Sequence, residues 1–498
     1  MVLHLIVLLL PFAGGLDTDW ESVARQYAQD MRADNDYTVR ERAVRLGADF
    51  KVVGATVFLC DALDESCAEQ QSLERRFAEL SQELADVLGQ DERLLPVKKR
   101  ESLAERKIIG ERVLREDLFC ALIVEFLGKR VDDESRSVVS ETVSKARDWR
   151  GKLRLMEVAA LQKNERAIPA ILIALEDKDP RIRMAAADSL ALIGAEASVD
   201  PLCRALTDKE QPVRYSVITA LSALKAKNSI PHLISALAKE EGLLRQNLSV
   251  LLEELTGQAL GIASESWSKW WSENGQVFLE QDVAPAVVAG PSKDKEDPFS
   301  YYGIKTYSKK VIFVLDISDS MNDSAEETVV PLSGIPKRTG NLRPKILVAR
   351  DHLTQALVAL PESATFNIVV YNKYVSTWKP KMVLANKRSK NEAIAYVLNL
   401  QAMEATNIMD ALDAAFRFGG VSLRDKYYPS EVDTIFFLTD GKATDGRLQD
   451  TKEIMAEVKR INKIGKVTLH TIGIGYLHDR PFLETLAKEN GGTYVNVQ

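Results

Sequence analysis

The feature that most constrains this chain is a segment of its first half that repeats with a period of 31 residues. The stretches 167–197, 198–228 and 229–259 each read as a helix, a short polar turn and a second helix. Five columns keep this register: Ile171/Leu202/Leu233, Ala174/Ala205/Ala236, Leu175/Leu206/Leu237, Arg183/Arg214/Arg245 and Leu190/Leu221/Leu252. A two-helix unit cannot bury its apolar face alone, so such units stack and share a continuous core. The period therefore predicts an all-α solenoid.

These units resemble HEAT repeats, in which an Asp-rich turn precedes a helix that opens with an Arg, as in "EDKDPRIR". The resemblance is strongest over 167–259, and we assign the HEAT-like solenoid to residues 131–261. A weaker echo, "ADNDYTVRERAVRLGA", stands at 33–48. It leaves open whether divergent repeats extend through the N-terminal helical region, residues 17–130.

An apolar seam precedes the repeats. Its members step by four, three, four and three residues: Leu73, Phe77, Leu80, Leu84 and Val87. This spacing places the side chains on one face of a helix. We expect the seam to pack against a neighbouring helix of the same chain; an intermolecular coiled coil is the alternative.

Three tryptophans follow the last repeat, in "SESWSKWWSENG". Trp267, Trp270 and Trp271 stand at positions i, i+3 and i+4, so they share one helix face. The terminal unit of a solenoid needs a cap, and we expect the tryptophans to form it rather than a platform for an aromatic ligand. The composition then shifts to Pro, Ala, Lys and Asp, and we assign residues 262–308 as cap and linker.

The N-terminus carries an apolar run typical of a secretory signal. Residues Val2–Phe12 form an apolar run interrupted only by His4, small residues follow, and the first charge is Asp17, although no Lys or Arg precedes the run. The run is too short to span a bilayer, which takes ~20 residues. We expect residues 1–15 to be a signal peptide and the chain to be exported to the periplasm, the cell surface or the medium. A buried N-terminal helix or strand is the alternative.

Length, charge and cysteine content exclude some classes of protein. A chain of 498 residues is expected to hold several domains, and a formal net charge of −7 argues against a nucleic-acid partner. The four cysteines form no CxxC pattern: Cys60, Cys67, Cys120 and Cys203. We expect them to be small buried residues, and whether Cys60 pairs with Cys67, or Cys120 with Cys203, stays open.

From Lys309 onward the sequence changes character. Short β-branched runs, "VIFVLD", "FNIVVY", "TIFFLTD" and "VTLHTIGIG", alternate with helical stretches. Nearly continuous apolar runs are expected of strands buried on both faces, and the alternation predicts a doubly wound parallel sheet over residues 309–498. The fold class is therefore multidomain, an all-α solenoid followed by an α/β Rossmann-like domain. In such sheets the binding crevice lies at the carboxyl ends of the strands.

Oxygen-bearing side chains collect at these strand ends. The first strand runs into Asp-x-Ser-x-Ser, a later strand ends in Thr-Asp-Gly, and a loop between them holds a threonine. The candidate ligands are Asp316, Ser318, Ser320, Thr406 and Asp440. Since the set holds no sulfur or imidazole, it suits a hard cation, Mg²⁺ before Mn²⁺ or Ca²⁺.

These three motifs, in this order, resemble the metal-ion-dependent adhesion site of von Willebrand factor A domains. The resemblance covers residues 309–498. The segment "YYGIKTYSKKVIFVLDISDSM", which leads into the domain, also resembles bacterial exported proteins that join helical repeats to such a domain. The resemblance to the adhesion site implies that the five residues hold the metal, some of them through water. Two positions depart from the family: Asp319 replaces a frequent Gly, and "EATN" replaces Gly-Gly-Thr-Asn.

The resemblance implies binding chemistry. Two carboxylates and neutral hydroxyls leave a divalent ion under-neutralised, so a partner protein's Asp or Glu becomes a favourable further ligand. We expect a non-enzymatic binding or adhesion protein without catalytic residues, whose repeats offer a second protein-interaction surface. The alternatives are a structural scaffold with an inactive metal site and a hydrolase, which lacks support because no His stands at motif spacing from a Ser or Cys nucleophile.

Overall fold

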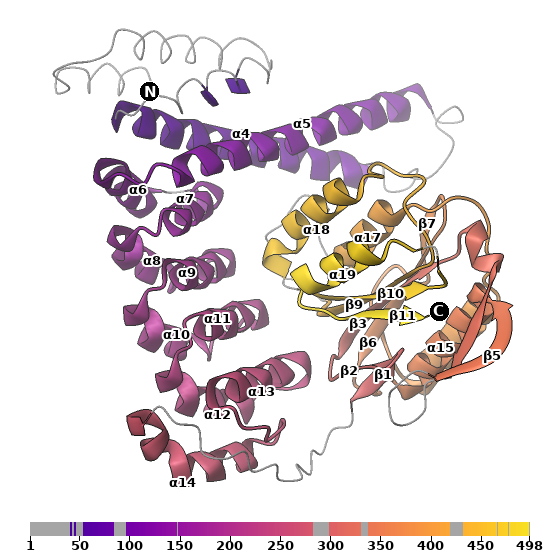
Figure 1. Cartoon of the computed structure of the whole chain (residues 1–498). Coiled ribbons are helices and arrows are strands. Elements are labelled where there is room, and N and C mark those ends of the chain that lie inside the picture. The colour runs from indigo at the N-terminus through magenta and orange to yellow at the C-terminus, as the bar shows by residue number, and fades with distance from the viewer. Residues whose placement is uncertain are drawn as a thin grey trace. The chain divides into compact units, whose positions relative to one another are not determined.

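The computed structural model describes residues 40–41, 44–45, 53–83, 96–146, 148–281, 298–329, 337–418, 432–465, 467–476 and 478–497. The chain divides into two compact units, Met1–Ser229 and Ile230–Gln498 (Figure 1). The proposed signal peptide, most of the weak repeat echo and nearly all of the Pro- and Ala-rich linker lie outside the described residues. No described helix is both long and apolar enough to cross a membrane.

Two long helices of the described part of the first unit, α4 (Val53–Glu83) and α5 (Val97–Gly128), pack on each other. The apolar seam lies in their interface, where Leu73, Phe77 and Leu80 contact Ile109 and Val113 of α5. The predicted packing against a neighbouring helix is therefore confirmed for these three positions. Leu84 and Val87 lie outside the described residues.

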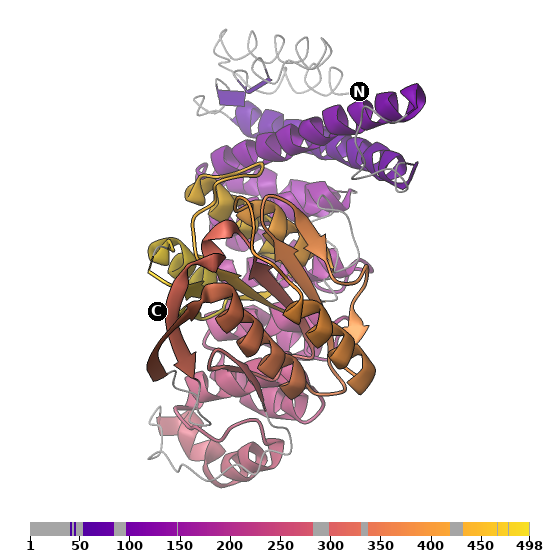
Figure 2. The same ribbon diagram turned by 90° about the vertical axis from the view of Figure 1, so that its right-hand side faces the viewer.

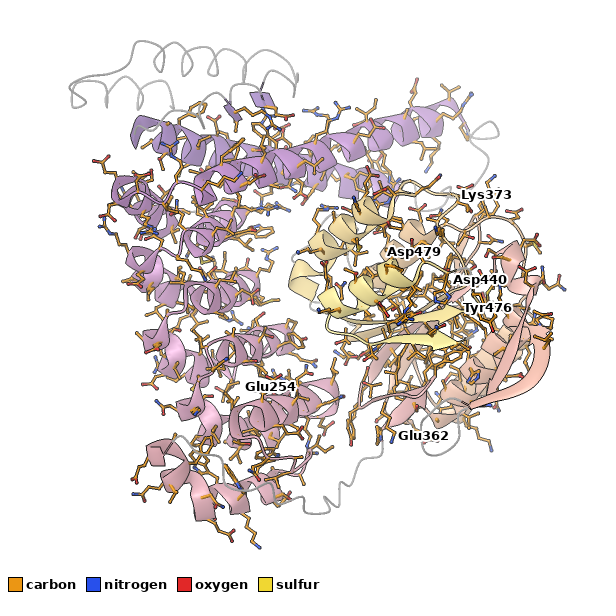
Figure 3. All side chains as sticks on the ribbon, viewed as in Figure 1. Glu254, Glu362, Lys373, Asp440, Tyr476 and Asp479 are labelled. Atoms are coloured by element: carbon orange, nitrogen blue, oxygen red, sulfur yellow. The ribbon has the colours of Figure 1, made fainter. Side chains whose placement is uncertain are left out.

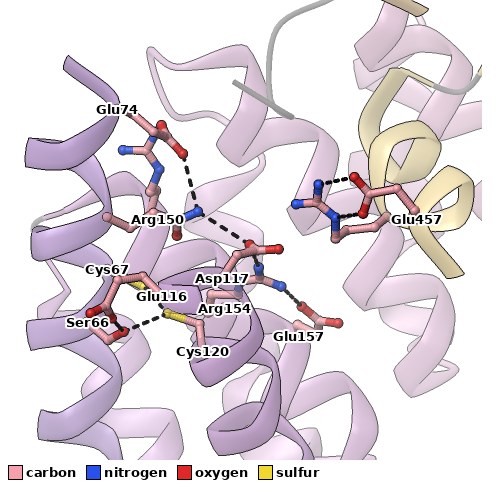
Figure 4. Close-up of polar contacts among 12 residues, drawn as sticks. Ser66, Cys67, Glu74, Glu116, Asp117, Cys120, Arg150, Arg154, Glu157 and Glu457 are labelled. Carbon is pink, nitrogen blue, oxygen red and sulfur yellow. Dashed lines mark hydrogen bonds and ion pairs between the residues drawn. The ribbon is translucent and has the colours of Figure 1, made fainter. Parts of the chain in front are cut away.

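Buried ion pairs attach α7 (Trp149–Leu161) to these two helices (Figure 4). Arg150 pairs with Glu74 of α4, and Arg154 donates to Asp117 Oδ1 of α5 at 2.9 Å. All four side chains are buried or nearly so. Each buried charge has an opposite charge beside it, so removal of one partner would leave an uncompensated buried charge.

All four cysteines are free and buried, as expected of small core residues. Cys67 lies beside Cys120, with 3.8 Å between the two Sγ atoms, and Cys120 contacts Ser66 (Figure 4). The neighbour of Cys67 is thus a residue of the adjacent helix, not Cys60.

The 31-residue period appears directly in the helix boundaries. The first helices of the three repeats are α8 (Ile168–Ala174), α10 (Val199–Ala205) and α12 (Ile230–Leu237), and the second helices are α9 (Pro180–Ile193), α11 (Gln211–Ala223) and α13 (Gly242–Thr256). In the first unit, α6 (Asp133–Lys145) and α7 precede them, and the pairs stack one on the next (Figure 1). The repeated leucine columns supply the core: Leu190 and Leu221 are fully buried. The predicted solenoid of helix pairs is confirmed.

The repeated arginine has a structural reason. Arg183 donates to the Asp177 carbonyl of its own turn at 2.8 Å, and to both carboxylate oxygens of Asp208, in the next turn, at 2.6 and 2.8 Å. One repeat later, Arg214 donates to the Asp208 carbonyl at 2.8 Å. One repeat earlier, Lys152 pairs with Asp177 at 3.2 Å. Lys152 and Arg183 therefore join consecutive turns, whereas this Arg214 bond lies within its own turn.

We predict that Arg183→Met lowers the stability of the helical unit by about 3 kcal/mol, because it leaves the nearly buried Asp208 carboxylate without its partner. Arg183 and Asp208 are only 8% and 11% exposed. Urea unfolding followed by circular dichroism at 222 nm measures the loss. The matched control is Arg204→Met, at an exposed arginine of α10, for which we expect less than about 0.5 kcal/mol. Equal losses in the two variants would contradict the prediction.

The second unit begins with the third repeat, which α14 (Ser264–Gln281) covers by packing on α12. Trp267 is fully buried and donates from Nε1 to the Gly261 carbonyl at 2.7 Å. Trp270 is 7% exposed and makes edge contacts with Trp267 and Phe278. The tryptophans therefore form a cap, and the burial of two of them contradicts a ligand platform.

The remainder of this unit is built on a seven-stranded sheet with the order β11-β10-β9-β3-β6-β7, in which β8 also pairs with β6. Its parallel strands are β3 (Lys310–Asp316), β6 (Thr365–Tyr371), β9 (Thr434–Thr439), β10 (Thr468–Ile474) and β11 (Tyr494–Val497). The edge strands β7 (Val375–Thr377) and β8 (Val383–Leu384) run antiparallel to β6. The predicted parallel sheet is confirmed for its centre, and the antiparallel edge was not predicted.

Helices cover both faces of the sheet (Figures 1 and 2). Val311, Phe313 and Leu315 of β3 pack in one core with α15 (Lys345–Ala359) and α16 (Lys387–Leu398). Ile312 and Val314 pack in the other core with α17 (Ile408–Arg417), α18 (Thr451–Gly465) and α19 (Arg480–Glu489). Since successive residues of a strand face opposite sides, the continuous apolar run of β3 fills both cores.

Two small hairpins complete the domain, and neither was predicted from the sequence. The strands β1 (Phe299–Tyr301) and β2 (Ile304–Thr306) form the first, and β4 (Ser324–Val329) and β5 (Lys337–Pro344) form the second. The second hairpin separates the Asp-x-Ser-x-Ser motif from α15 along the chain.

Candidate metal centre

The candidate site lies where β3 and β9 end. These strands are neighbours, with Leu315 opposite Leu438, so Asp316 and the pair Thr439–Asp440 leave the sheet at the same edge. Asp440 and Tyr476, which follow β9 and β10, are seen at this end of the sheet in Figure 3. The predicted oxygen-bearing loops therefore share one edge of the sheet.

Asp316 is fully buried, and its two oxygens accept hydrogen bonds from three groups. The backbone N–H of Ser318 donates to Oδ1 at 2.8 Å, while the hydroxyls of Thr439 and Tyr371 donate to Oδ2 at 2.7 and 3.3 Å. Burial, with the nearby Asp440 carboxylate as a smaller cause, raises the pKa of Asp316 to about 6 despite these donors. The carboxylate is thus held in place at an electrostatic cost that a nearby cation would reduce.

The two serines join Asp316 to Asp440. Ser318 Oγ lies 3.2 Å from Ser320 Oγ, and Ser320 Oγ donates to Asp440 Oδ1 at 2.8 Å. Ser318 and Asp440 are 1% exposed, and Ser320 is half-buried. The structure therefore brings four of the five predicted residues into one hydrogen-bonded group.

Thr406, the fifth predicted residue, is not part of this hydrogen-bonded group and is held through its backbone to the loop of Thr444. Its backbone N–H donates to Thr444 Oγ1 at 3.0 Å, and its carbonyl accepts from the N–H groups of Thr444 and Asp445 at 2.9 and 3.2 Å. The loop before α17 is thereby fixed to the loop that follows Asp440. A Cβ on Gly446 (φ +99°) would lie 2.0 Å from Asn407 Oδ1, so the close approach of these two loops requires a glycine at position 446.

The two departures from the adhesion-site pattern have separate consequences. Asp319 is exposed, and its carboxylate accepts from Asn322 Nδ2 at 3.2 Å, so it adds a charge at the surface rather than inside the site. Glu404 adopts a positive φ of 67°, a conformation that favours glycine. Its carbonyl accepts from the Asp319 N–H at 2.9 Å, which ties the Thr406 loop to the serine loop.

The sequence analysis missed Lys345, the first residue of α15. Its ammonium donates to Asp440 Oδ2 at 2.8 Å and to the Ser320 carbonyl at 3.2 Å, and the side chain is only 4% exposed. No sequence signal identifies it, because the β4–β5 hairpin separates it from the motif. Tyr371 was also missed, although it ends the strand next to β3, opposite Asp316, and could have been found by that register.

The donor set fits a hard divalent cation. Two carboxylates and two hydroxyls lie in one hydrogen-bonded group, and oxygen ligands of this kind suit a hard cation. The fully buried Asp316 carboxylate also favours a cation beside it. The residues present could therefore hold Mg²⁺, Mn²⁺ or Ca²⁺.

Comparisons with known proteins agree with this architecture. Residues 341–496 match the von Willebrand factor type A domain, and residues 137–214 and 168–252 match HEAT repeats. The human inter-alpha-trypsin inhibitor heavy chain H4 is 29% identical over 224 residues, which are 44% of this chain and 22% of that protein. The matched segment thus spans about a fifth of that relative.

Two solved structures show lower similarity. A von Willebrand factor type A protein from Catenulispora acidiphila is 19% identical, with a TM-score of 0.30, and the match covers 41% of this chain and 47% of that one. The proximal thread matrix protein 1 of the mussel byssus, with a zinc-occupied adhesion motif, is 18% identical, with a TM-score of 0.28 over 38% of this chain and 43% of that one. The family matches, not these two structures, show that the chain carries HEAT repeats and a von Willebrand factor type A domain.

We predict that Thr439→Val destabilises this domain by about 1–3 kcal/mol, because it leaves one oxygen of the buried Asp316 with a single weaker donor, Tyr371. Thermal unfolding without added metal measures the loss. The same substitution at the exposed Thr377 of β7 is the control, and we expect it to change stability by less than about 0.5 kcal/mol. If Thr439→Val behaves like the control, the Thr439 hydroxyl does not support Asp316.

Proposed function

We propose that this chain, which carries HEAT repeats and a von Willebrand factor type A domain, is a non-enzymatic protein-binding protein that captures a partner's carboxylate at a metal site. The proposed ligands are Asp316, Ser318, Ser320, Thr406 and Asp440, with Mg²⁺ as the preferred ion. The observation that supports this best is the hydrogen-bonded group of two buried carboxylates and two serines at the strand ends.

The bound cation would supply an electrophilic position that accepts an Asp or Glu oxygen of the partner. The chain's own residues prepare this position: Thr439 and Tyr371 orient Asp316, Ser320 orients Asp440, and Thr444 holds the Thr406 loop. None of these roles needs a proton to be transferred to a substrate. The set therefore suits binding rather than hydrolysis.

The repeats would form a second protein-interaction surface, since stacked helix pairs expose an extended face. We also propose that the chain is exported, on the apolar N-terminal run, and that residues 309–498 form the metal-binding domain behind a linker. One specific observation favours a second function, a scaffold in which the site binds no metal. It is Lys345, whose ammonium already neutralises Asp440.

Calorimetric titration of the full chain with Mg²⁺, Mn²⁺ and Ca²⁺ tests the metal site. We expect saturable binding of one ion, and a loss of affinity of at least about tenfold in Asp316→Ala and in Ser320→Ala, because each removes an oxygen from the site. Asp319→Ala is the matched control, since it removes an exposed carboxylate of the same loop. We expect this variant to bind like the wild type.

Two results would contradict the proposal. Absence of binding by the wild type would favour the scaffold function, and equal losses in Asp319→Ala and Asp316→Ala would mean that the ion binds at the surface. Acetate serves as the probe of carboxylate capture. In an NMR titration, it should shift amide signals of the site loops in Mg²⁺ and leave them unchanged in EDTA.

A further inference from the structure

We propose that the Lys345 ammonium is a resident cation of the metal site, which holds Asp440 when no divalent ion is bound and opposes an ion that binds there. Lys345 would thereby set the metal affinity of the site and stabilise its metal-free form. This inference rests on the proposed metal-binding function and adds a residue that neither the motif nor the family matches assign.

The first support is the geometry of the ion pair. Lys345 Nζ lies 2.8 Å from Asp440 Oδ2, 3.2 Å from the Ser320 carbonyl oxygen and 3.7 Å from Asp323 Oδ2. The Lys345 side chain is 4% exposed and that of Asp440 is not exposed. A buried ammonium and a buried carboxylate each need the other, so this contact is an obligatory pair and not a surface salt bridge.

The second support is that the surrounding backbone makes room for this lysine. A Cβ on Gly475, which follows β10, would lie 2.7 Å from Lys345 Cε and 3.4 Å from its Nζ. Gly475 also has a φ of +78°, and its N–H donates to the Val497 carbonyl at 2.6 Å. At the other end, the Lys345 N–H donates to the Asp323 carbonyl at 2.9 Å. The lysine is therefore fixed at its backbone, and its side chain occupies a space that a larger residue at position 475 would remove.

Competition with a divalent ion follows from the contacts of Asp440. Its Oδ1 accepts from Ser320 and its Oδ2 accepts from Lys345, so both oxygens are engaged in the metal-free state. A divalent ion that binds either oxygen of Asp440 must lie close to the Lys345 ammonium and is repelled by it. The ammonium therefore weakens metal binding and replaces part of the stabilisation that the metal would provide.

The charge balance gives a consequence for the partner. With both carboxylates ionised, Asp316, Asp440 and Lys345 together carry one negative charge, and a divalent ion changes this to one positive charge. The loaded site is then neutralised by one carboxylate of the partner. Without Lys345, two carboxylates and a divalent ion would already sum to zero, so the under-neutralised ion expected from the sequence requires the lysine; the neutral site would attract that carboxylate less.

The test compares the full-length wild type with Lys345→Met and Lys345→Gln. By calorimetry, we expect both variants to bind Mg²⁺ at least about tenfold more tightly, because the competing charge is removed. In EDTA, we expect Lys345→Met to unfold at a lower temperature than the wild type, since Asp440 loses its partner. Added Mg²⁺ should then raise the unfolding temperature of Lys345→Met by more than it raises that of the wild type. Lys345→Gln keeps a hydrogen-bond donor near Asp440 and preserves the test if Lys345→Met does not fold.

Two controls separate the local contact from general charge effects. Lys442→Met removes an exposed charge two residues after Asp440 and should leave the affinity unchanged. Lys345→Arg keeps the charge and should bind Mg²⁺ as weakly as the wild type, or more weakly. Acetate binding in Mg²⁺ should weaken in Lys345→Gln when it is measured at metal saturation.

The outcomes distinguish this inference from the proposed function. If the wild type binds the metal, and Lys345→Met and Lys345→Gln bind it equally well or more weakly, the inference is wrong. The proposed metal site is then still supported. Binding by the variants alone supports the inference and shows that the lysine blocks the site in the wild type. Absence of binding in the wild type and in both variants overturns the metal site, and the inference with it.

Discussion

Burial of carboxylates at the end of a sheet is the constraint on which the candidate site depends. Strand β3 is covered on both faces, so its interior positions must be apolar and polar chemistry is confined to its end. Asp316 stands at that end and is fully buried, which requires donors for both of its oxygens. Ser318, Thr439 and Tyr371 provide them from three segments. The positions of these segments thus follow from satisfying one buried acid.

In the helical first half, charged side chains of the turns are also partly buried, and ion pairs between consecutive turns neutralise them. Each helix pair buries apolar columns against its neighbours, but the turns carry charges that burial would make costly. In the first unit, a basic residue of one repeat pairs with an acid of the next turn, as Lys152 does with Asp177 and Arg183 with Asp208. The same Arg183 guanidinium also satisfies turn carbonyls. One column of charges therefore sets the spacing of successive turns, while the leucine columns supply the hydrophobic core.

The two buried acids of the site are stabilised in different ways, and Lys345 accounts for the difference. Asp316 relies on hydroxyl and amide donors, and Asp440 has a full positive charge beside it. Donors alone leave the pKa of Asp316 raised to about 6, because burial and Asp440 outweigh them. The site therefore combines one acid that an added cation would stabilise and one whose cation is already in place. The buried Lys345–Asp440 contact is the physical basis for expecting metal affinity to depend on a residue outside the motif.

The sequence by itself determined the features that rest on local periodicity and spacing. The 31-residue step predicted the helix pairs, the alternation of apolar runs and helical stretches predicted the parallel core of the sheet, and the three motifs predicted which oxygens share its edge. These features can be predicted from the sequence because each depends on residues close together in the chain or on a simple repeat.

Only the tertiary structure decided the contacts between distant segments. It placed Lys345 on Asp440, 95 positions away, and Cys67 beside Cys120, and it turned Asp319 to the surface. It also added the β4–β5 hairpin and the antiparallel edge of the sheet. Such contacts depend on how the packed elements position their ends in space, which neither composition nor spacing encodes.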